Sequence, residues 1–259
     1  MDTFVSADWL AERLEDVRVV DVRDGWEYEG IGHLPGAVSI PFGEFRSGEG
    51  DEGMLPGADR WADLLSAAGI GVEDDVVAYD DTHGVFAARF LVTAELYGHD
   101  PARLHLLDGD YSAWSRERPT TTDAVEPDPT EYEPREPADS PLVGFDEVAA
   151  ALEAEGTVVV DTREAWEFEE GHLPGAVQLD WMELVDAESR GLKPRDELAS
   201  ILADRGVTPD RRVLLYCNTA RRISHTYLVL GHLGYDDLAF YEGSLTEWEA
   251  RGGATETGT

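Results

Sequence analysis

Short apolar runs alternate along this chain with longer stretches of helical periodicity. Four runs rich in valine and other strand-forming residues predict β-strands: VRVVDV (17–22), DDVVAYD (74–80), TVVVDT (157–162) and RRVLLYC (211–217). Four stretches predict helices, at 6–17, 87–98, 144–156 and 223–234. Strands that alternate with helices predict an α/β fold, in which a parallel sheet is covered by helices.

The same pattern occurs twice in the chain. Residues 19–38 read VVDVRDGWEYEGIGHLPGAV, and residues 159–177 read VVDTREAWEFEEGHLPGAV. Further on, VVAYDDTHGVFAARFLV (76–92) aligns with VLLYCNTARRISHTYLV (213–229), and LDGDYSAW with YEGSLTEW. Blocks repeated in the same order predict two similar domains, residues 1–118 and 141–259. We expect the strand that ends in tyrosine to be central in each sheet.

The segment between the two copies, residues 119–140, is rich in proline and acidic residues and poor in apolar ones. Such a composition predicts an extended linker and no packed element.

The chain is very acidic, with 55 Asp and Glu against 20 Lys and Arg and a formal net charge of −35. The excess is spread over the chain: −16 in residues 1–118, −6 in 119–140 and −13 in 141–259. This charge repels nucleic acid and anionic lipid, so we expect neither as a partner. Dense carboxylates with a single lysine, Lys193, favour a protein of a salt-loving archaeon over an ordinary acidic protein.

Two features of the sequence bear on location. It contains no apolar run long enough to cross a membrane, and its first residues do not form a signal peptide. A single cysteine cannot form an intrachain disulfide, which fits a reducing compartment. We therefore expect a cytoplasmic protein.

The single cysteine, Cys217, follows the predicted strand 211–217 and begins the turn into the next helix. Ligand sites of α/β sheets lie at the carboxyl ends of strands, and a helix N-terminus favours anions and the thiolate form of a cysteine. Arg221 and Arg222 add two cations. Cys217 is therefore the candidate nucleophile; the alternative is a small apolar residue buried at a strand end.

The first copy serves as an internal comparison. It has Asp80 at the position of Cys217, and Gly84 and Val85 at the positions of the two arginines. The first domain should therefore be inert. The pairs Asp21/Asp161, Arg23/Arg163 and His33/His172 occur in both copies, which favours structural roles: an Asp–Arg pair, and a histidine that fixes a turn.

The repeated VVD(V/T)R…GHLPGAV, the segment YCNTARRISHT and YEGSLTEW together resemble the tandem-domain rhodanese family of thiosulfate sulfurtransferases. The resemblance spans nearly the whole chain. It implies two rhodanese-like α/β domains, each with a mostly parallel central sheet flanked by helices. It also implies sulfur transfer through a persulfide on Cys217, from a small anionic donor to cyanide or a thiol.

The resemblance further implies which residues surround the cysteine. The loop that binds the donor comprises Asn218, Thr219, Ala220, Arg221 and Arg222, and Phe86 of the first domain is a candidate apolar wall. Arg222 is favoured as the arginine that contacts the donor, because it closes the loop. No metal or organic cofactor is implied, and we expect a monomer.

Three positions depart from the family pattern. Glycine is usual where Ala220 stands, a basic residue is common at Asn218, and many thiosulfate enzymes have an arginine where Glu167 stands. These departures leave 3-mercaptopyruvate open as an alternative donor. A persulfide carrier or sensor is a further alternative. A cysteine phosphatase is disfavoured, because it needs arginine six residues after the cysteine, where this chain has Ile223.

Overall fold

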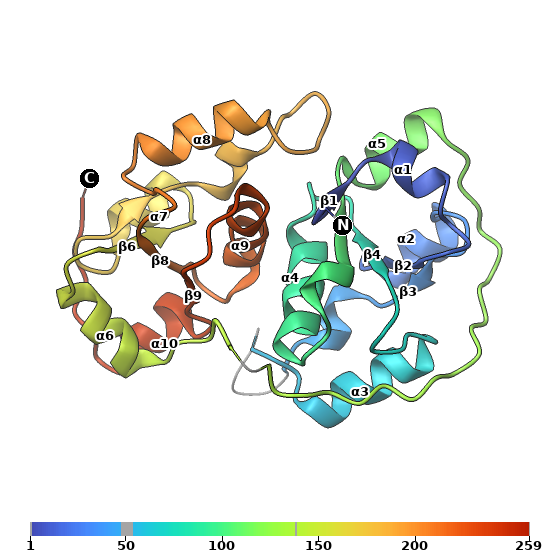
Figure 1. The fold of residues 1–259 in the computed structure, drawn as a ribbon, viewed down its shortest axis with the longest axis horizontal. Helices are drawn as coiled ribbons and strands as arrows, with labels where there is room; N and C mark the ends of the chain where they lie inside the picture. Colours follow the sequence, from blue (N-terminus) through green and yellow to red (C-terminus); the bar gives the residue numbers. More distant parts are fainter. Residues whose placement is uncertain (1, 48–53, 138, 259) are drawn as a thin grey trace. The chain divides into compact units, whose positions relative to one another are not determined.

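The computed structural model describes residues 2–47, 54–137 and 139–258 and divides into two compact units (Figure 1). The first unit comprises Met1–Ser140 together with Ala187–Gly191, and the second comprises Pro141–Asp186 and Leu192–Thr259. The division near residue 140 lies where the sequence changes from proline-rich linker to the second copy. The short segment 187–191 is part of the first unit although its neighbours in the chain belong to the second.

The first unit is built on a five-stranded sheet in which every strand pairing is parallel. The strands, in spatial order, are β1 (Phe4–Val5), β5 (Leu104–Leu107), β4 (Val76–Tyr79), β2 (Arg18–Asp21) and β3 (Val38–Ser39). β4 and β5 consist mainly of valine and leucine and are buried throughout, as parallel strands covered by helices should be. The strand that ends in Tyr79 is central, as the sequence predicts.

Helices follow the strands of this unit: α1 (Ala7–Ala11), α2 (Gly25–Gly30), α3 (Ala58–Ala67), α4 (Val85–Leu96) and α5 (Asp110–Glu117), with 3-10 turns η1 (Phe42–Phe45) and η2 (Pro101–Arg103). α4 is apolar on nearly every side and correspondingly buried. α1 is shorter than the predicted helix 6–17, because turns replace the helix after Ala11. Among the described residues, no helix combines the length and apolar character that crossing a bilayer requires.

The second unit repeats this plan with four strands, again all parallel. Their order is β7 (Val177–Gln178), β6 (Thr157–Asp161), β8 (Arg212–Tyr216) and β9 (Leu238–Phe240). The helices are α6 (Phe145–Glu153), α7 (Ala165–Glu170), α8 (Arg195–Ala203), α9 (Arg221–Leu233) and α10 (Ser244–Ala250), with the 3-10 turn η3 (Trp181–Leu184). β8, which ends in Tyr216, is an interior strand and leads into α9 (Figure 1).

The Asp–Arg and histidine motifs hold the same turn together in both copies. In the second unit, Arg163 Nη2 lies 2.6 Å from Asp161 Oδ2 and donates to the carbonyl of Gly171 at 2.6 Å. His172 contacts the carbonyl of Phe168 through Nδ1 at 2.8 Å, and its ring stacks on that phenyl ring. The structural role predicted for these motifs is therefore confirmed.

Residues 119–137 of the linker pack against the first unit, whereas the composition of the linker predicts an extended tether. Thr121 forms an isolated bridge with His33, and the Thr130 N–H donates to the Ser66 carbonyl at 3.0 Å. Tyr132 is buried in this unit. The segment stays extended, as its prolines require, yet these backbone hydrogen bonds and one aromatic side chain attach it.

Stability is expected to rise with salt, because the net charge of −35 is spread along the chain and added ions screen its self-repulsion. Raising KCl from about 0.1 M to about 2 M should raise the melting temperature by at least about 2 °C, the effect of roughly 1 kcal/mol in a protein of this size. Circular dichroism melts measure this shift. Sucrose at matched osmolarity is the control, and an unchanged melting temperature in KCl would contradict a charge-limited stability.

Candidate functional site

Cys217 lies where the sequence predicts it, at the carboxyl end of the interior strand β8. It is almost fully buried, and its backbone is fixed on both sides. Its N–H donates to Ser244 Oγ at 3.1 Å, and its carbonyl accepts from the N–H of Leu245 at 3.0 Å. Ser244 in turn donates to the carbonyl of Tyr241 at 2.9 Å. The start of the loop is therefore anchored through the main-chain contacts of Cys217 and not through its thiol.

The loop after Cys217 turns sharply at Ala220, whose φ is +64°. A non-glycine residue in this left-handed region is strained by about 1 kcal/mol. Ser224 Oγ donates to the Ala220 carbonyl at 2.8 Å and holds the turn at the start of α9. His83, the equivalent of Ala220 in the first copy, has φ +56°, so both copies form the same turn.

The first copy shows how such a loop holds an anion. The Asp80 side chain is fully buried and lies where the second copy has Cys217. Its Oδ1 accepts the N–H groups of Thr82 and Gly84, both at 2.8 Å, and its Oδ2 accepts those of Phe86 at 2.7 Å and Ala87 at 3.1 Å. Burial raises the pKa of Asp80, and these four donors oppose the rise. The equivalent N–H groups of the second copy are those of Thr219, Arg221, Ile223 and Ser224.

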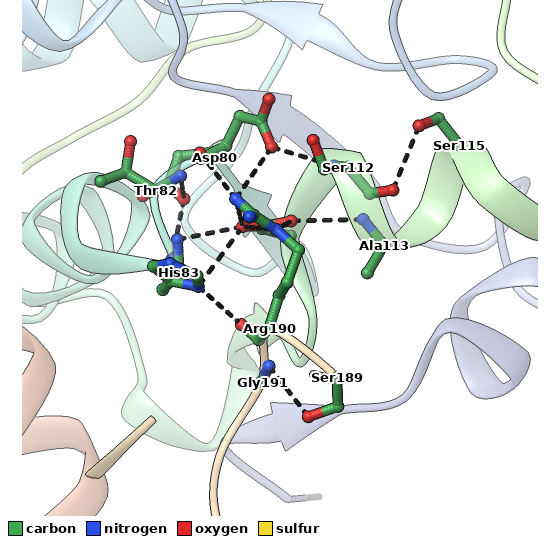
Figure 2. Close-up of polar contacts among 12 residues, drawn as sticks. Asp80, Thr82, His83, Ser112, Ala113, Ser115, Ser189, Arg190 and Gly191 are labelled. Atoms are coloured by element: carbon green, nitrogen blue, oxygen red, sulfur yellow. Dashed lines mark hydrogen bonds and ion pairs between the residues drawn. The ribbon is translucent and has the colours of Figure 1, made fainter. Parts of the chain in front are cut away.

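A second set of polar contacts closes the first-copy loop (Figure 2). Arg190, from the segment 187–191, donates through Nε to both carboxylate oxygens of Asp110 at 2.9 and 3.0 Å, and through Nη2 to the carbonyl of Asp81 at 3.1 Å. Asp110 also accepts the N–H of His83 at 3.0 Å. In the alignment of the two copies, Asp110 is the counterpart of Ser244. The side chain at this position therefore accepts a loop N–H in each copy, that of His83 in the first and that of Cys217 in the second.

We expect the first domain to stay inert even when it is given a thiol. In the double variant Asp80→Cys/Cys217→Ser, the new cysteine would lie next to Asp81 in a loop that has Gly84 and Val85 in place of Arg221 and Arg222. Arg190, the cation at this loop, is already paired with the carboxylates of Asp110 and Asp81. Nearby negative charge disfavours the thiolate.

Thiocyanate formation from thiosulfate and cyanide measures the outcome of this exchange, and the far-UV spectrum checks the fold. A folded double variant that transfers sulfur as fast as the wild-type protein would show that the backbone N–H groups suffice without the arginines.

A network of charged and polar side chains supports the Cys217 loop. Arg222 Nη1 forms an ion pair with Glu167 Oε2, and Asn218 Nδ2 donates to Glu167 Oε1 at 2.9 Å. Arg163 Nη1 reaches Asn218 Oδ1 at 3.4 Å, which connects the network to the Asp161–Arg163 pair. Burial tends to raise the pKa of Glu167, but the hydrogen bond and charge of Arg222 outweigh it, so this pKa is lowered.

The charge of Arg221 interacts with that of Cys217, whereas Arg222, which the sequence favours for the donor contact, is paired with Glu167. Burial, followed by the neighbouring charge of Arg222, lowers the pKa of Arg221, while the charges of Cys217 and Glu167 act in the opposite direction. A partly buried guanidinium beside a thiol strengthens the attraction for an anion, because the surrounding dielectric is lower than that of water.

The structure brings the candidate residues 217–222 together in the second unit. Phe86 belongs to the first unit, where its ring lies 4.5 Å from that of Phe42 and lines a cavity of about 410 Å³ together with Asp80 and Asp81. Its role as a wall over Cys217 stays a prediction. Among the described residues, no three His, Cys, Asp or Glu side chains are grouped as they would be to hold a metal ion.

Sequence reasoning missed three contacts that hold the two loops. These are the pairing of Glu167 with Arg222, the anchoring of Cys217 by Ser244, and the contact of Arg190 with Asp110. The repeat carried a signal for one of them, since Ser244 and Asp110 occupy equivalent polar positions.

Comparison with known protein families finds the same two copies. The model of the rhodanese-like domain matches the chain twice, over residues 6–117 and 145–251. The chain belongs to the rhodanese-like family. The expected fold class, two rhodanese-like α/β domains, is confirmed.

Relatives of this rhodanese-like chain align over nearly its whole length. A thiosulfate sulfurtransferase of Corynebacterium glutamicum is 32% identical over 269 residues, which cover 95% of this chain and 87% of the relative. A Haloferax volcanii protein provisionally named a thiosulfate sulfurtransferase is 30% identical, with 95% and 93% covered.

Solved structures agree with this assignment. SseA of Escherichia coli, a 3-mercaptopyruvate sulfurtransferase, has a TM-score of 0.83 and 26% identity, over 94% of this chain and 99% of SseA. The ergothioneine complex of EanB has a TM-score of 0.89, over 99% of this chain and 70% of that protein. At 20% identity, the likeness to EanB is one of fold alone.

Proposed function

We propose that this protein is a sulfurtransferase that moves the outer sulfur of thiosulfate through a Cys217 persulfide to cyanide or a thiol. One observation carries the proposal. The loop that begins at Cys217 has the same turn as the first-copy loop, where four backbone N–H groups bind a carboxylate. A nucleophilic sulfur at the mouth of an anion-binding loop suits reaction with a small anionic sulfur compound.

In the first half-reaction, the Cys217 thiolate attacks the outer sulfur of thiosulfate. A new S–S bond forms, the original S–S bond breaks, and sulfite leaves with the bonding electron pair. Both the donor and sulfite are anions, so the loop N–H groups and the Arg221 guanidinium stabilise the site throughout. The product is a persulfide on Cys217.

In the second half-reaction, cyanide or a thiolate attacks the outer sulfur of that persulfide. The Cys217–sulfur bond breaks, thiocyanate or a new persulfide leaves, and the Cys217 thiolate is regenerated. No electrons enter or leave the cycle, so it needs no external oxidant or reductant. Ping-pong kinetics are expected, because the donor product departs before the acceptor reacts.

A second candidate donor is 3-mercaptopyruvate. Two observations support it: the likeness to SseA, and the ion pair that Arg222 makes with Glu167 beside the loop. In donation from 3-mercaptopyruvate, the Cys217 thiolate attacks the donor sulfur, the C–S bond breaks with its electron pair on carbon, and the resulting enolate takes up the proton of the donor thiol and leaves as pyruvate. The product is the same Cys217 persulfide. Thiosulfate remains the first choice, since the C. glutamicum relative carries that name.

Mass spectrometry of the intact protein tests the function directly. After incubation with thiosulfate and desalting, the mass should rise by about 32 Da, the mass of one sulfur atom, and cyanide should remove the increment. The chain has one cysteine, so the site of the adduct is unambiguous. Absence of the adduct with thiosulfate and its presence with 3-mercaptopyruvate would assign the second donor.

A further inference from the structure

Glu167 binds the Cys217 loop through both of its carboxylate oxygens. Its two carboxylate oxygens bind different loop residues: Oε1 accepts from Asn218, the residue after the cysteine, and Oε2 pairs with Arg222, at the start of α9. Glu167 is only 8% exposed, so little water screens these contacts.

Helix capping explains why a glutamate stands here, but it does not explain these contacts. Glu167 accepts the N–H of Glu164 at 3.2 Å, and its first-copy counterpart Glu27 accepts that of Asp24 at 3.1 Å. Both residues therefore lie in the first turn of their own helix, α7 or α2, and cap it by accepting the N–H of its N-cap residue. Only Glu167 faces a loop with an arginine, since the first copy has Val85 at the position of Arg222. Capping is common to both copies, and neutralisation of an arginine is specific to the second.

The charges around Arg222 show what Glu167 contributes. Arg163 is paired with Asp161, and Arg222 is paired with Glu167. The charge of Arg222 also acts to lower the pKa of Asp180, but burial outweighs it and this pKa is raised. The Glu167 carboxylate thus reduces the positive charge that the two adjacent loop arginines bring to the site. It also accepts a hydrogen bond from Asn218, the residue next to Cys217.

We propose that Glu167 sets the charge preference of the Cys217 site: its carboxylate neutralises Arg222 and lowers the attraction of the loop for a doubly charged sulfur donor relative to a singly charged one. The proposal rests on the proposed function for the identity of the donors. A carboxylate acts twice as strongly on a dianion as on a monoanion at the same distance, because Coulomb energy scales with charge. Glu167 is thus a positioning residue that also adjusts specificity.

The charge at Cys217 can be measured without any sulfur donor. Iodoacetate is an anion and iodoacetamide is neutral, and both alkylate a thiolate by the same displacement. The ratio of their rates at one pH therefore reports the local charge and cancels the thiolate fraction. Glu167→Gln keeps an oxygen for the cap, loses the hydrogen bond from Asn218 and removes the charge, and it should raise the iodoacetate-to-iodoacetamide ratio about three- to tenfold.

Three further variants separate charge from structure. Glu27→Gln makes the same change at the equivalent cap of the first copy, and should leave the ratio unchanged. Arg222→Gln should lower the ratio by a similar factor, because it leaves the Glu167 carboxylate without its cation. The double variant Glu167→Gln/Arg222→Gln should return the ratio to within about twofold of the wild-type value, since its charge is balanced again. A purely structural role for Glu167 predicts no such return.

An unchanged ratio in a folded Glu167→Gln protein overturns the proposal. If that variant fails to fold, Arg222→Gln decides, and an unchanged ratio there overturns the proposal equally. All rates are compared at one salt concentration at which every variant keeps the wild-type far-UV spectrum.

Donor kinetics then connect the charge to specificity. Glu167→Gln should lower the KM for thiosulfate about three- to tenfold and that for 3-mercaptopyruvate by less, with kcat changing little. A KM for thiosulfate that stays at the wild-type value while the alkylation ratio rises overturns the specificity part of the proposal. If no persulfide forms from either donor in any variant, the proposed function fails, whereas the alkylation ratio still decides whether Glu167 controls the charge.

Discussion

Cys217→Ser is expected to abolish sulfur transfer while the protein remains folded. Serine cannot form a persulfide, and its hydroxyl is a far weaker nucleophile than a thiolate, so thiocyanate production should fall by at least about a thousandfold. The fold should survive because the contacts at this position are made by the backbone, to Ser244 Oγ and from the N–H of Leu245. A buried exchange of sulfur for oxygen should cost about 1–2 kcal/mol.

Steady-state thiocyanate assays measure the loss of sulfur transfer, and thermal melts measure whether the fold is retained. Cys217→Ala serves as a second variant that has no hydroxyl and leaves the same backbone contacts in place. Substantial turnover by either folded variant would mean that sulfur does not pass through Cys217.

Arg221→Ala is expected to raise the KM for thiosulfate about 5- to 150-fold, which corresponds to the roughly 1–3 kcal/mol of a hydrogen bond to a charged group. The net charge of −35 opposes the approach of a dianion, so cations near the cysteine must supply the local attraction. Arg221 is suited to this because it is partly buried and its charge interacts with that of Cys217. Singly charged 3-mercaptopyruvate should be affected less.

Arg221→Lys is the matched control, because it keeps the charge and loses the planar guanidinium. A small effect of lysine beside a large effect of alanine would assign the role of Arg221 to charge. Arg222→Ala should also raise KM, since it leaves Glu167 without its cation. Wild-type KM values in both alanine variants would remove the electrostatic basis for choosing thiosulfate.

Local patterns and the internal repeat predicted much of this molecule. Valine-rich runs predicted β2, β4, β6 and β8, and the aligned copies predicted that both tyrosine-ending strands are interior. They also predicted Cys217 at the carboxyl end of β8, before a helix expected over 223–234 that the structure shows over Arg221–Leu233. These features depend on residues close together in the chain, where periodicity and glycine positions determine the backbone.

Contacts between distant residues were beyond that reasoning. Glu167 and Arg222 lie 55 positions apart, and nothing in the local pattern of either predicts the pair. The packing of the linker likewise depends on a few contacts, such as the buried Tyr132, within a segment whose composition is typical of a tether. Charged side chains can adopt many partners, so only the folded backbone selects one.

The segment 187–191 has a consequence for the order in which the chain folds. Arg190 lies 80 positions beyond Asp110 and 109 beyond Asp81, yet it completes the polar contacts of the first unit. During synthesis, the first unit must wait for these residues, although its strands and helices are finished some 70 positions earlier. Closing so long a loop is entropically costly, so we expect this contact to form late. Until it forms, the buried Asp110 carboxylate lacks its arginine, and the nascent first unit is less stable than its own sheet and helices suggest.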